Sequence, residues 1–316
     1  MSLLLFAIMI QGAFHLFLWC MLFLLVLAVG TPSHRKPFLI TLAVSGLLCS
    51  FRIVPATIAY WSSKRAFISG YPTLRELFDG LTAIRDDTFP ALGGTVGVLG
   101  WWEYDAYLGL LGFAAVLYFG VYLSFRKDPR LEDCRYEQLW LPVGVLTLFS
   151  LSYFYVPIAY LPLPLAACER VPTRFLTVPL VMIVLVACIR MERLLPALQR
   201  RPLMQVLAVL ALLETAFSLA THSHAWRLAS VETHFVYTRD TRFAAVLRQL
   251  AQGGTVIAQQ PLDRFYIRAT NIAVLVSLCT LVCVVSLLVW RWVTARRKAV
   301  PEGAAFAAKS TARPAG

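Results

Sequence analysis

The residues best placed to do chemistry are ionisable side chains inside long apolar stretches, where a charge is costly and usually has a function. Arg52 lies within the apolar stretch 47–55, and its planar guanidinium could hold a phosphate through two parallel hydrogen bonds. Glu214 interrupts a later apolar stretch and could pair with Arg52 or His15, or act as an acid–base group. The alternatives are a structural ion pair and, for Arg52, a side chain that reaches back to the membrane interface.

His15 and Gln11 share one face of the first apolar stretch, because they are four residues apart. If they lie at the same depth as Arg52 and Glu214, the four side chains predict a polar cavity that opens to the outside.

Two carboxylates lie among aromatic residues in the segment 100–109, Gly-Trp-Trp-Glu-Tyr-Asp-Ala-Tyr-Leu-Gly. Glu103 and Asp105 are therefore candidate catalytic bases, and they could also bind a metal ion. The tryptophans and tyrosines equally fit the aromatic belt of a membrane interface.

Two arginines precede another apolar stretch in the segment 168–175, Cys-Glu-Arg-Val-Pro-Thr-Arg-Phe. Arg170 and Arg174, together with Arg52, are candidate ligands for an anionic lipid head group or a diphosphate. The alternative is that Arg170 pairs with Glu169 while Arg174 extends to the interface.

No metal-binding or nucleotide-binding motif stands out. His222, His224 and His234 lack a fixed further ligand, so a solvated loop is the favoured interpretation. The sequence has no Gly-rich phosphate loop, Gly-x-Ser-x-Gly elbow or His-Glu-x-x-His pair. We therefore predict no metal-ligating residues and no cofactor, and we leave a divalent metal open.

The amino-acid composition indicates the class of protein in which these residues lie. Hydrophobic residues make up 59% of the 316, and the mean hydropathy is +0.69, an excess that one soluble core cannot bury. The net charge of +12 fits basic residues flanking membrane spans, and no motif supports a nucleic-acid partner. The seven cysteines are scattered and form no disulfide framework.

The apolar stretches predict an all-α polytopic membrane protein, because lipid-exposed backbone must satisfy its own hydrogen bonds. The transmembrane helical domain covers residues 1–300, and the Ala-rich segment 301–316 is predicted to be a disordered tail. Seven spans are expected, at about 3–29, 37–60, 104–124, 138–156, 173–190, 203–220 and 270–292.

Basic residues near the span ends set the orientation. Clusters at 35–36, 126–135, 190–201 and 291–298 alternate with the spans if the N-terminus is outside and the C-terminus inside. The large outer loops are then about 61–103 and 221–269. We expect a multi-pass protein of the inner (plasma) membrane, with membrane lipids as its surroundings.

Small extracytoplasmic elements are predicted in these loops. The apolar stripe over 73–84 predicts a surface helix that Thr73 caps, with Glu76 three residues on. A second helix over 241–252 and a short strand over 255–258 are expected in the last loop. The fourth span is expected to break near Pro157, and 157–172 to re-enter the membrane in part.

The sequence enters its first span directly from Met1, with no basic region before it, and this is unlike a secretory signal peptide. We therefore expect the chain to be the C-terminal part of a longer membrane protein.

Two short segments carry a family resemblance. The segment 102–109 and the segment 169–175, with a basic turn between them, resemble the C-terminal half of bacterial GT-C-like polytopic membrane glycosyltransferases. This group includes proteins related to the YfhO type of lipoteichoic-acid glycosylation. Arg-Ile-Val-Pro at 52–55 is also similar to a family element before a large outer loop, and the likeness covers about residues 35–220.

The resemblance implies transfer of a sugar from a polyprenyl-phosphate donor on the extracytoplasmic face. It would give a phosphate-binding role to Arg52, Arg170 or Arg174, and a base role to Glu103 or Asp105 in direct displacement at the anomeric carbon. The family's catalytic acid lies in a first outer loop that has no counterpart here.

Two other functions stay open. A non-catalytic membrane subunit that binds a lipid or a protein partner fits the absence of a clear catalytic acid. A transporter is the weaker alternative: the broken fourth span and the charges within spans allow it, but no inverted repeat is visible.

Overall fold

The structure, a computed structural model, describes residues 1–61, 68–84, 88–90, 98–100, 103–126, 128–161, 169, 171–198, 202–238 and 263–299. This part of the chain is overwhelmingly helical, as the apolar stretches predict. In chain order, its α-helices are α1 (Ser2–Ile10), α2 (Phe14–Gly30), α3 (Arg35–Leu48), α4 (Ser50–Trp61), α5 (Leu74–Thr82), α6 (Leu110–Ala115), α7 (Leu123–Phe125), α8 (Trp140–Ser150), α9 (Ser152–Ala159), α10 (Thr177–Leu198), α11 (Pro202–Thr238) and α13 (Arg264–Ala299).

Shorter elements join these helices. A π-helix, η3 (Val116–Tyr122), continues α6 into α7. One antiparallel strand pair, β1 (Thr88–Pro90) with β2 (Val98–Gly100), was not predicted from the sequence. The 3-10 helices are η1 (Pro32–His34), η4 (Pro129–Cys134), η5 (Glu137–Leu139) and η6 (Pro172–Leu176).

Two helical stretches are long and apolar enough to cross a membrane. They are Pro172–Leu194 and Arg264–Ala295, and the pair Phe14–Gly30 and Pro32–Leu48, bent by 116°, adds a third if it counts as one span. The chain therefore has the helices of a membrane protein. The seven spans and their orientation stay predictions.

The first predicted span, 3–29, is not one helix. It divides into α1 and α2 at Gly12, whose φ of +87° lies in the left-handed region that favours glycine. The hydropathy pattern missed this break because the sequence on both sides of Gly12 is strongly apolar.

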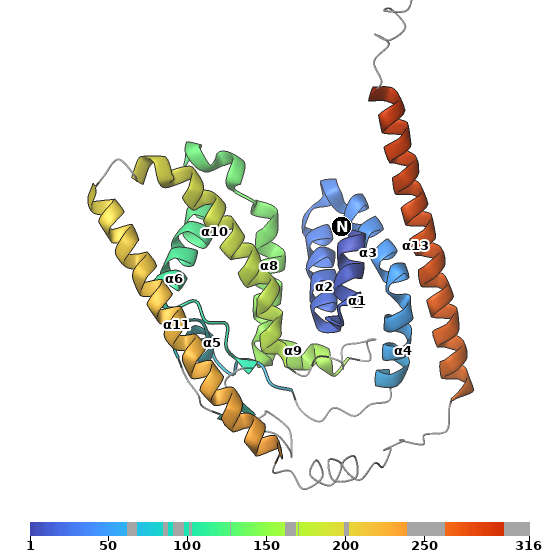
Figure 1. The fold of residues 1–316 in the computed structure, drawn as a ribbon, viewed down its shortest axis with the longest axis horizontal. Helices are drawn as coiled ribbons and strands as arrows, with labels where there is room; N and C mark the ends of the chain where they lie inside the picture. Colours follow the sequence, from blue (N-terminus) through green and yellow to red (C-terminus); the bar gives the residue numbers. More distant parts are fainter. Residues whose placement is uncertain are drawn as a thin grey trace, which may run out of the picture.

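The second and seventh predicted spans pack side by side as α3, α4 and α13 (Figure 1). The hydroxyl of Ser277 on α13 accepts a hydrogen bond from the amide of Phe51, at 3.0 Å, where α3 gives way to α4. The Ser50 hydroxyl donates to the carbonyl of Ala273 at 2.8 Å. Polar groups at the break are therefore satisfied by the neighbouring helix.

The fourth predicted span breaks at Leu151 and not near Pro157, which lies inside α9. At the break, Tyr71 pairs with the chain as a parallel bridge: its amide donates to the carbonyl of Ser150 at 3.0 Å, and its carbonyl accepts from Ser152 at 3.1 Å. These bonds satisfy backbone groups that a continuous helix would have paired internally.

The helix at the sixth predicted span, α11, is longer than expected. It continues to Thr238, so the first part of the predicted outer loop, from residue 221, is helical. No glycine or proline occurs between Pro202 and Gly253 to end it. The predicted helix over 241–252, the strand over 255–258 and the tail from 301 lie outside the described residues.

The helices form two groups that meet at α2 and α8. Figure 1 shows α1 to α4 with α13 on one side, and α5, α6, α8, α10 and α11 on the other. The main apolar core lies at this junction and includes Phe17, Phe23, Leu48, Leu146 and Phe175. Figure 1 also places the start of α3, the junction of α10 with α11 and the end of α13 at one end of the molecule. The side of the membrane that this end faces stays a prediction.

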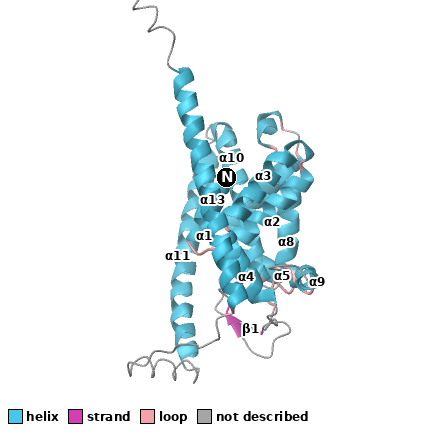
Figure 2. Ribbon diagram, turned by 90° about the vertical axis from the view of Figure 1, so that its right-hand side faces the viewer, coloured by secondary structure: helices cyan, strands magenta, loops and turns pink. Residues whose placement is uncertain are grey.

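A small folded layer lies at the opposite end, where Figure 2 shows α5, α9 and β1. The predicted cap of α5 is confirmed, since the Thr73 hydroxyl accepts from the amide of Arg75 at 3.1 Å. The segment 103–109 lies against α5, with the amide of Ala106 donating to the carbonyl of Gly80 at 2.9 Å. A Cβ at Gly80 would lie 2.5 Å from the Tyr104 carbonyl oxygen, so this close approach requires glycine.

Candidate functional site

The predicted base Glu103 and the predicted phosphate ligand Arg174 form an ion pair in this layer. Nε of Arg174 donates to Oε2 of Glu103 at 3.0 Å, and Nη2 lies 2.8 Å from Oε1 and 2.6 Å from Oε2. The Glu103 side chain is 16% exposed and that of Arg174 is 39% exposed. Glu103 is therefore engaged by a guanidinium, a poor arrangement for a general base.

The two segments of the family resemblance thus lie in contact. A second bond joins them, because the Thr173 hydroxyl donates to the backbone carbonyl of Glu103 at 2.5 Å. Thr173 and Arg174 belong to η6, which leads directly into α10. Sequence spacing alone could not show that residues 71 positions apart would share one site.

The other predicted base, Asp105, is buried against His222 of α11. Its Oδ2 lies 2.6 Å from Nε2 of His222, and its Oδ1 accepts from the amide of Tyr107 at 3.1 Å. The Asp105 side chain is 3% exposed, whereas the His222 side chain is 19% exposed. The group of this pair that can reach solvent is therefore the imidazole.

Tyr107 fixes the position of that imidazole. Its ring stacks on His222, with centroids 4.2 Å apart and planes 4° from parallel, and its hydroxyl is hydrogen-bonded to Ser218. Ser218 and His222 are one helical turn apart on α11. His222 was assigned to a solvated loop in the sequence analysis, and that assignment is wrong, because α11 extends past it.

A pair of tyrosines forms the buried centre of the layer. The Tyr71 hydroxyl donates to the Tyr104 carbonyl at 2.5 Å, and the Tyr104 hydroxyl is hydrogen-bonded to Ser69. Burial raises the pKa of the Tyr71 phenol well above its usual range, and the charge of Asp105 raises it further. Burial also raises the pKa of the Tyr104 phenol, although the hydrogen bond from Ser69 opposes this. Both phenols are therefore neutral hydrogen-bonding groups at physiological pH.

His15 pairs with Glu169 and not with Glu214 or Arg52. Its Nδ1 lies 3.1 Å from Oε2 of Glu169, which also accepts from Nε1 of Trp19 at 2.9 Å. Oε1 of Glu169 accepts from the amide of Val171 at 3.1 Å. The expected partner Glu214 is not involved. Arg170, a predicted phosphate ligand, lies outside the described residues.

The predicted shared cavity of Arg52, Glu214, His15 and Gln11 is not formed. Arg52 and Glu214 are both exposed, and Figure 1 places their helices, α4 and α11, on opposite sides of the molecule. Neither side chain has an ion-pair partner in the part of the chain that the structure describes. The charges predicted to lie within the membrane therefore do not converge on one site.

Arg190 is a buried cation that the sequence analysis counted only as part of a basic cluster. It is fully buried in α10 and has no carboxylate partner among the described residues. Its guanidinium donates to the carbonyls of Cys134, Phe119, Gly120 and Arg135 and to the Ser124 hydroxyl, at 2.6–3.0 Å. The π-helical turns of η3 direct two of these carbonyls toward it.

Within the described residues, no group of three or more His, Cys, Asp or Glu side chains is arranged to hold a metal ion. Among the described residues, the acidic side chain in contact with His222 is Asp105, and His224, two residues further along α11, is exposed.

Comparisons with known protein families, with curated proteins and with solved structures find no match for this chain. Its function must therefore be argued from the site itself.

Proposed function

We propose that this chain is a GT-C-like membrane glycosyltransferase component, which binds the phosphate of a polyprenyl-phosphate sugar donor beside α5 and uses Arg174 as the phosphate ligand. The observation that carries the proposal is the two-pronged contact between Glu103 and Arg174, which joins the two segments of the family resemblance.

Arg174 is suited to this role because Glu103 uses only part of its guanidinium. The described contacts engage Nε and Nη2, and they leave Nη1 without an acceptor among the described residues. The side chain is 39% exposed, so the remaining N–H groups are accessible to a ligand. A guanidinium held at one edge by a carboxylate is already oriented to donate to a phosphate oxygen. Glu103 is thus proposed as a positioning residue, in place of its predicted role as base.

His222 is the proposed proton acceptor of the transfer. An ionised Asp105 can only accept, so in the proposed site Nε2 of His222 donates to it and the neutral imidazole carries its lone pair on Nδ1. In the reaction, the acceptor hydroxyl oxygen would form a bond to the anomeric carbon while the bond from that carbon to the phosphate oxygen breaks. The hydroxyl proton would pass to Nδ1 of His222, and Arg174 would stabilise the charge on the leaving phosphate.

A direct binding experiment tests the phosphate site. The purified chain would be placed in phosphatidylcholine nanodiscs and titrated with undecaprenyl phosphate, with uncharged undecaprenol as the matched probe. We expect tighter binding of the phosphate, and a loss of roughly ten-fold for Arg174→Gln, because one charged hydrogen-bonding group is removed. Arg193→Gln, which changes an exposed arginine on α10, the helix that follows η6, is the control. Equal binding of the two probes would refute the proposal.

A non-catalytic membrane subunit is the second candidate, and one observation favours it. Both carboxylates predicted as bases are engaged by side-chain partners, Glu103 by Arg174 and Asp105 by His222, so neither is free to act alone. Co-purification of one stable protein partner, together with no preference for undecaprenyl phosphate over undecaprenol, would support this function over transfer.

A further inference from the structure

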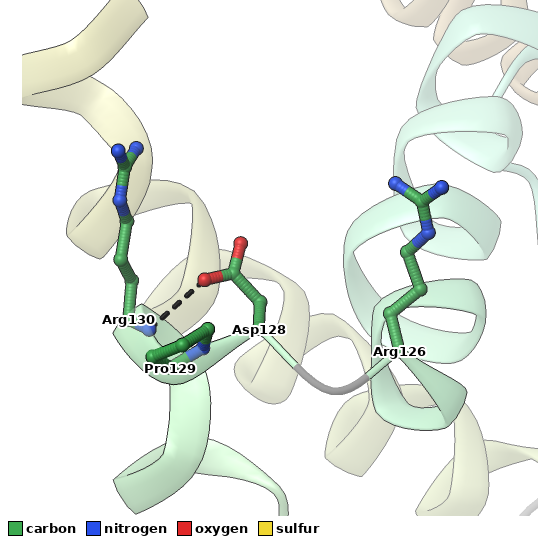
Figure 3. Close-up of a pocket in the computed structure, with 4 residues that line it drawn as sticks. All are labelled: Arg126, Asp128, Pro129 and Arg130. Atoms are coloured by element: carbon green, nitrogen blue, oxygen red, sulfur yellow. Dashed lines mark hydrogen bonds between the residues drawn. The ribbon is translucent and has the colours of Figure 1, made fainter.

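An open cavity of about 620 Å³ is lined by Arg126, Asp128, Pro129 and Arg130 (Figure 3). Figure 1 shows the green segment around residue 130 at the end of the molecule away from α5 and the proposed donor site. Arg126 and Asp128 lie between α7 and η4, and Pro129 and Arg130 are the first two residues of η4; we call these four residues the basic turn. Figure 3 shows the two guanidiniums and the carboxylate projecting to the same side of the turn. None of the interactions of this cavity takes part in the proposed transfer.

The buried Arg190 forms hydrogen bonds to the segments on both sides of the basic turn. This buried guanidinium donates to the carbonyl of Gly120 and the hydroxyl of Ser124 before the turn, and to the carbonyl of Cys134 after it. Within the turn, Oδ1 of Asp128 accepts from the amide of Arg130 at 2.9 Å. The backbone that carries both cavity arginines is thus fixed at each end before any ligand binds, which lowers the entropic cost of binding.

We propose that this cavity binds the phosphate head group of an anionic phospholipid. Two guanidiniums and one carboxylate give the lining a formal charge of +1, which matches a phosphodiester. Neither Arg126 nor Arg130 has a carboxylate partner among the described residues, so both can donate to phosphate oxygens. Oδ2 of Asp128 has no described partner and is placed to accept from a head-group hydroxyl.

The surface beside the cavity favours a lipid over a soluble phosphate. The Arg126 guanidinium lies over the ring of Tyr122, 5.5 Å from its centroid, and Tyr122 stacks on Tyr118. Tyr118, Tyr122 and Phe125 are all exposed, so an aromatic surface continues from the cavity along η3 and α7. Aromatic rings next to cations are typical of the membrane interface, where they contact acyl chains beneath a head group.

Lipid retention by the intact chain tests this site. The protein would be exchanged into detergent with equal amounts of phosphatidylglycerol and phosphatidylcholine, and the lipids that stay bound would be counted by native mass spectrometry. We expect selective retention of phosphatidylglycerol, and a fall of roughly ten- to thirty-fold for Arg126→Gln/Arg130→Gln. Arg193→Gln/Arg291→Gln removes two other exposed arginines and should change nothing.

Asp128→Asn provides a second test, in which lipid binding is expected to increase and not to decrease. Asparagine retains a side-chain carbonyl that can accept from the Arg130 amide, while the lining gains one positive charge. Retention of phosphatidylglycerol should therefore increase. If neither Arg126→Gln/Arg130→Gln nor Asp128→Asn changed the retention of phosphatidylglycerol, the proposal would be overturned. So would displacement of the lipid by millimolar inorganic phosphate with no effect of Tyr118→Leu/Tyr122→Leu, which would assign the cavity to a soluble phosphate.

Discussion

Oδ2 of Asp105 lies 2.6 Å from Nε2 of His222, although 117 residues separate them in the chain. This contact attaches the long helix α11 to the segment 103–109, with Tyr107 stacked against the imidazole. Because the Asp105 carboxylate is buried and the His222 imidazole is partly exposed, the imidazole is the group of this pair that can exchange a proton with solvent.

The Asp105–His222 contact predicts that His222→Phe will destabilise the protein more than His222→Gln. Phenylalanine can preserve the stack on Tyr107 but leaves Oδ2 of Asp105 buried without its hydrogen-bond partner, at a cost of about 1–3 kcal/mol. The measurement is thermal unfolding in detergent. His224→Phe, two positions on and exposed, is the control, and it should melt like the wild type. Equal melting temperatures for all three variants would contradict a stabilising contact.

Arg190 predicts a second stability effect. Arg190→Gln should lower the free energy of unfolding by about 3–5 kcal/mol, as when one partner of a buried charged interaction is removed, because several carbonyls lose their donor. The same denaturation measurement on Arg193→Gln, an exposed neighbour on α10, should show a change below about 0.5 kcal/mol. Similar losses for the two variants would mean that the guanidinium network is not what stabilises this turn.

The two buried tyrosines predict a loss of stability at alkaline pH. Their pKa values are higher in the folded chain than in the unfolded chain, so the folded state holds these protons more tightly. Their contribution is fully present below about pH 10 and is lost as the pH rises through the folded-state pKa values. Unfolding temperatures measured from pH 8 to pH 12 should therefore fall at the top of this range.

Tyr71→Phe isolates the tyrosine effect. Its melting temperature should fall less steeply with alkaline pH than that of the wild type, and it should be lower at neutral pH because the bond to the Tyr104 carbonyl, about 1 kcal/mol, is lost. Tyr118→Phe, on the exposed surface of η3, should titrate and melt like the wild type. Identical alkaline profiles for Tyr71→Phe and the wild type would rule out this explanation.

The membrane orientation is open to cysteine labelling. In intact cells, a membrane-impermeant maleimide should label Leu74→Cys on α5, which is 70% exposed, and should not label Arg130→Cys in the basic turn. A parent chain without the native exposed cysteines provides the background. Labelling of residue 130 from outside would reverse the orientation and move the proposed donor site to the other side of the membrane.

The sequence alone determined the class of the protein and much of its secondary structure. Long apolar stretches specify helices because lipid-exposed backbone must be paired internally, and the Thr73 cap of α5 follows from bonds within one turn. The breaks within helices were not predicted correctly from the sequence. A single glycine, Gly12, marks the first break, and the break at Leu151 depends on a bridge to Tyr71, which lies 80 residues earlier in the chain.

Only the tertiary structure decided which partner each charge takes. Residue type alone identified Glu103, Asp105 and Arg174 as candidates. The structure shows that Arg174 contacts Glu103 and that His222 contacts Asp105, and these partners were not predicted. Arg190 was missed for the same reason. Short-range pattern rules describe a helix or a turn, whereas the energy of a buried charge depends on groups brought within about 3 Å by packing of distant segments, which no spacing along the chain encodes.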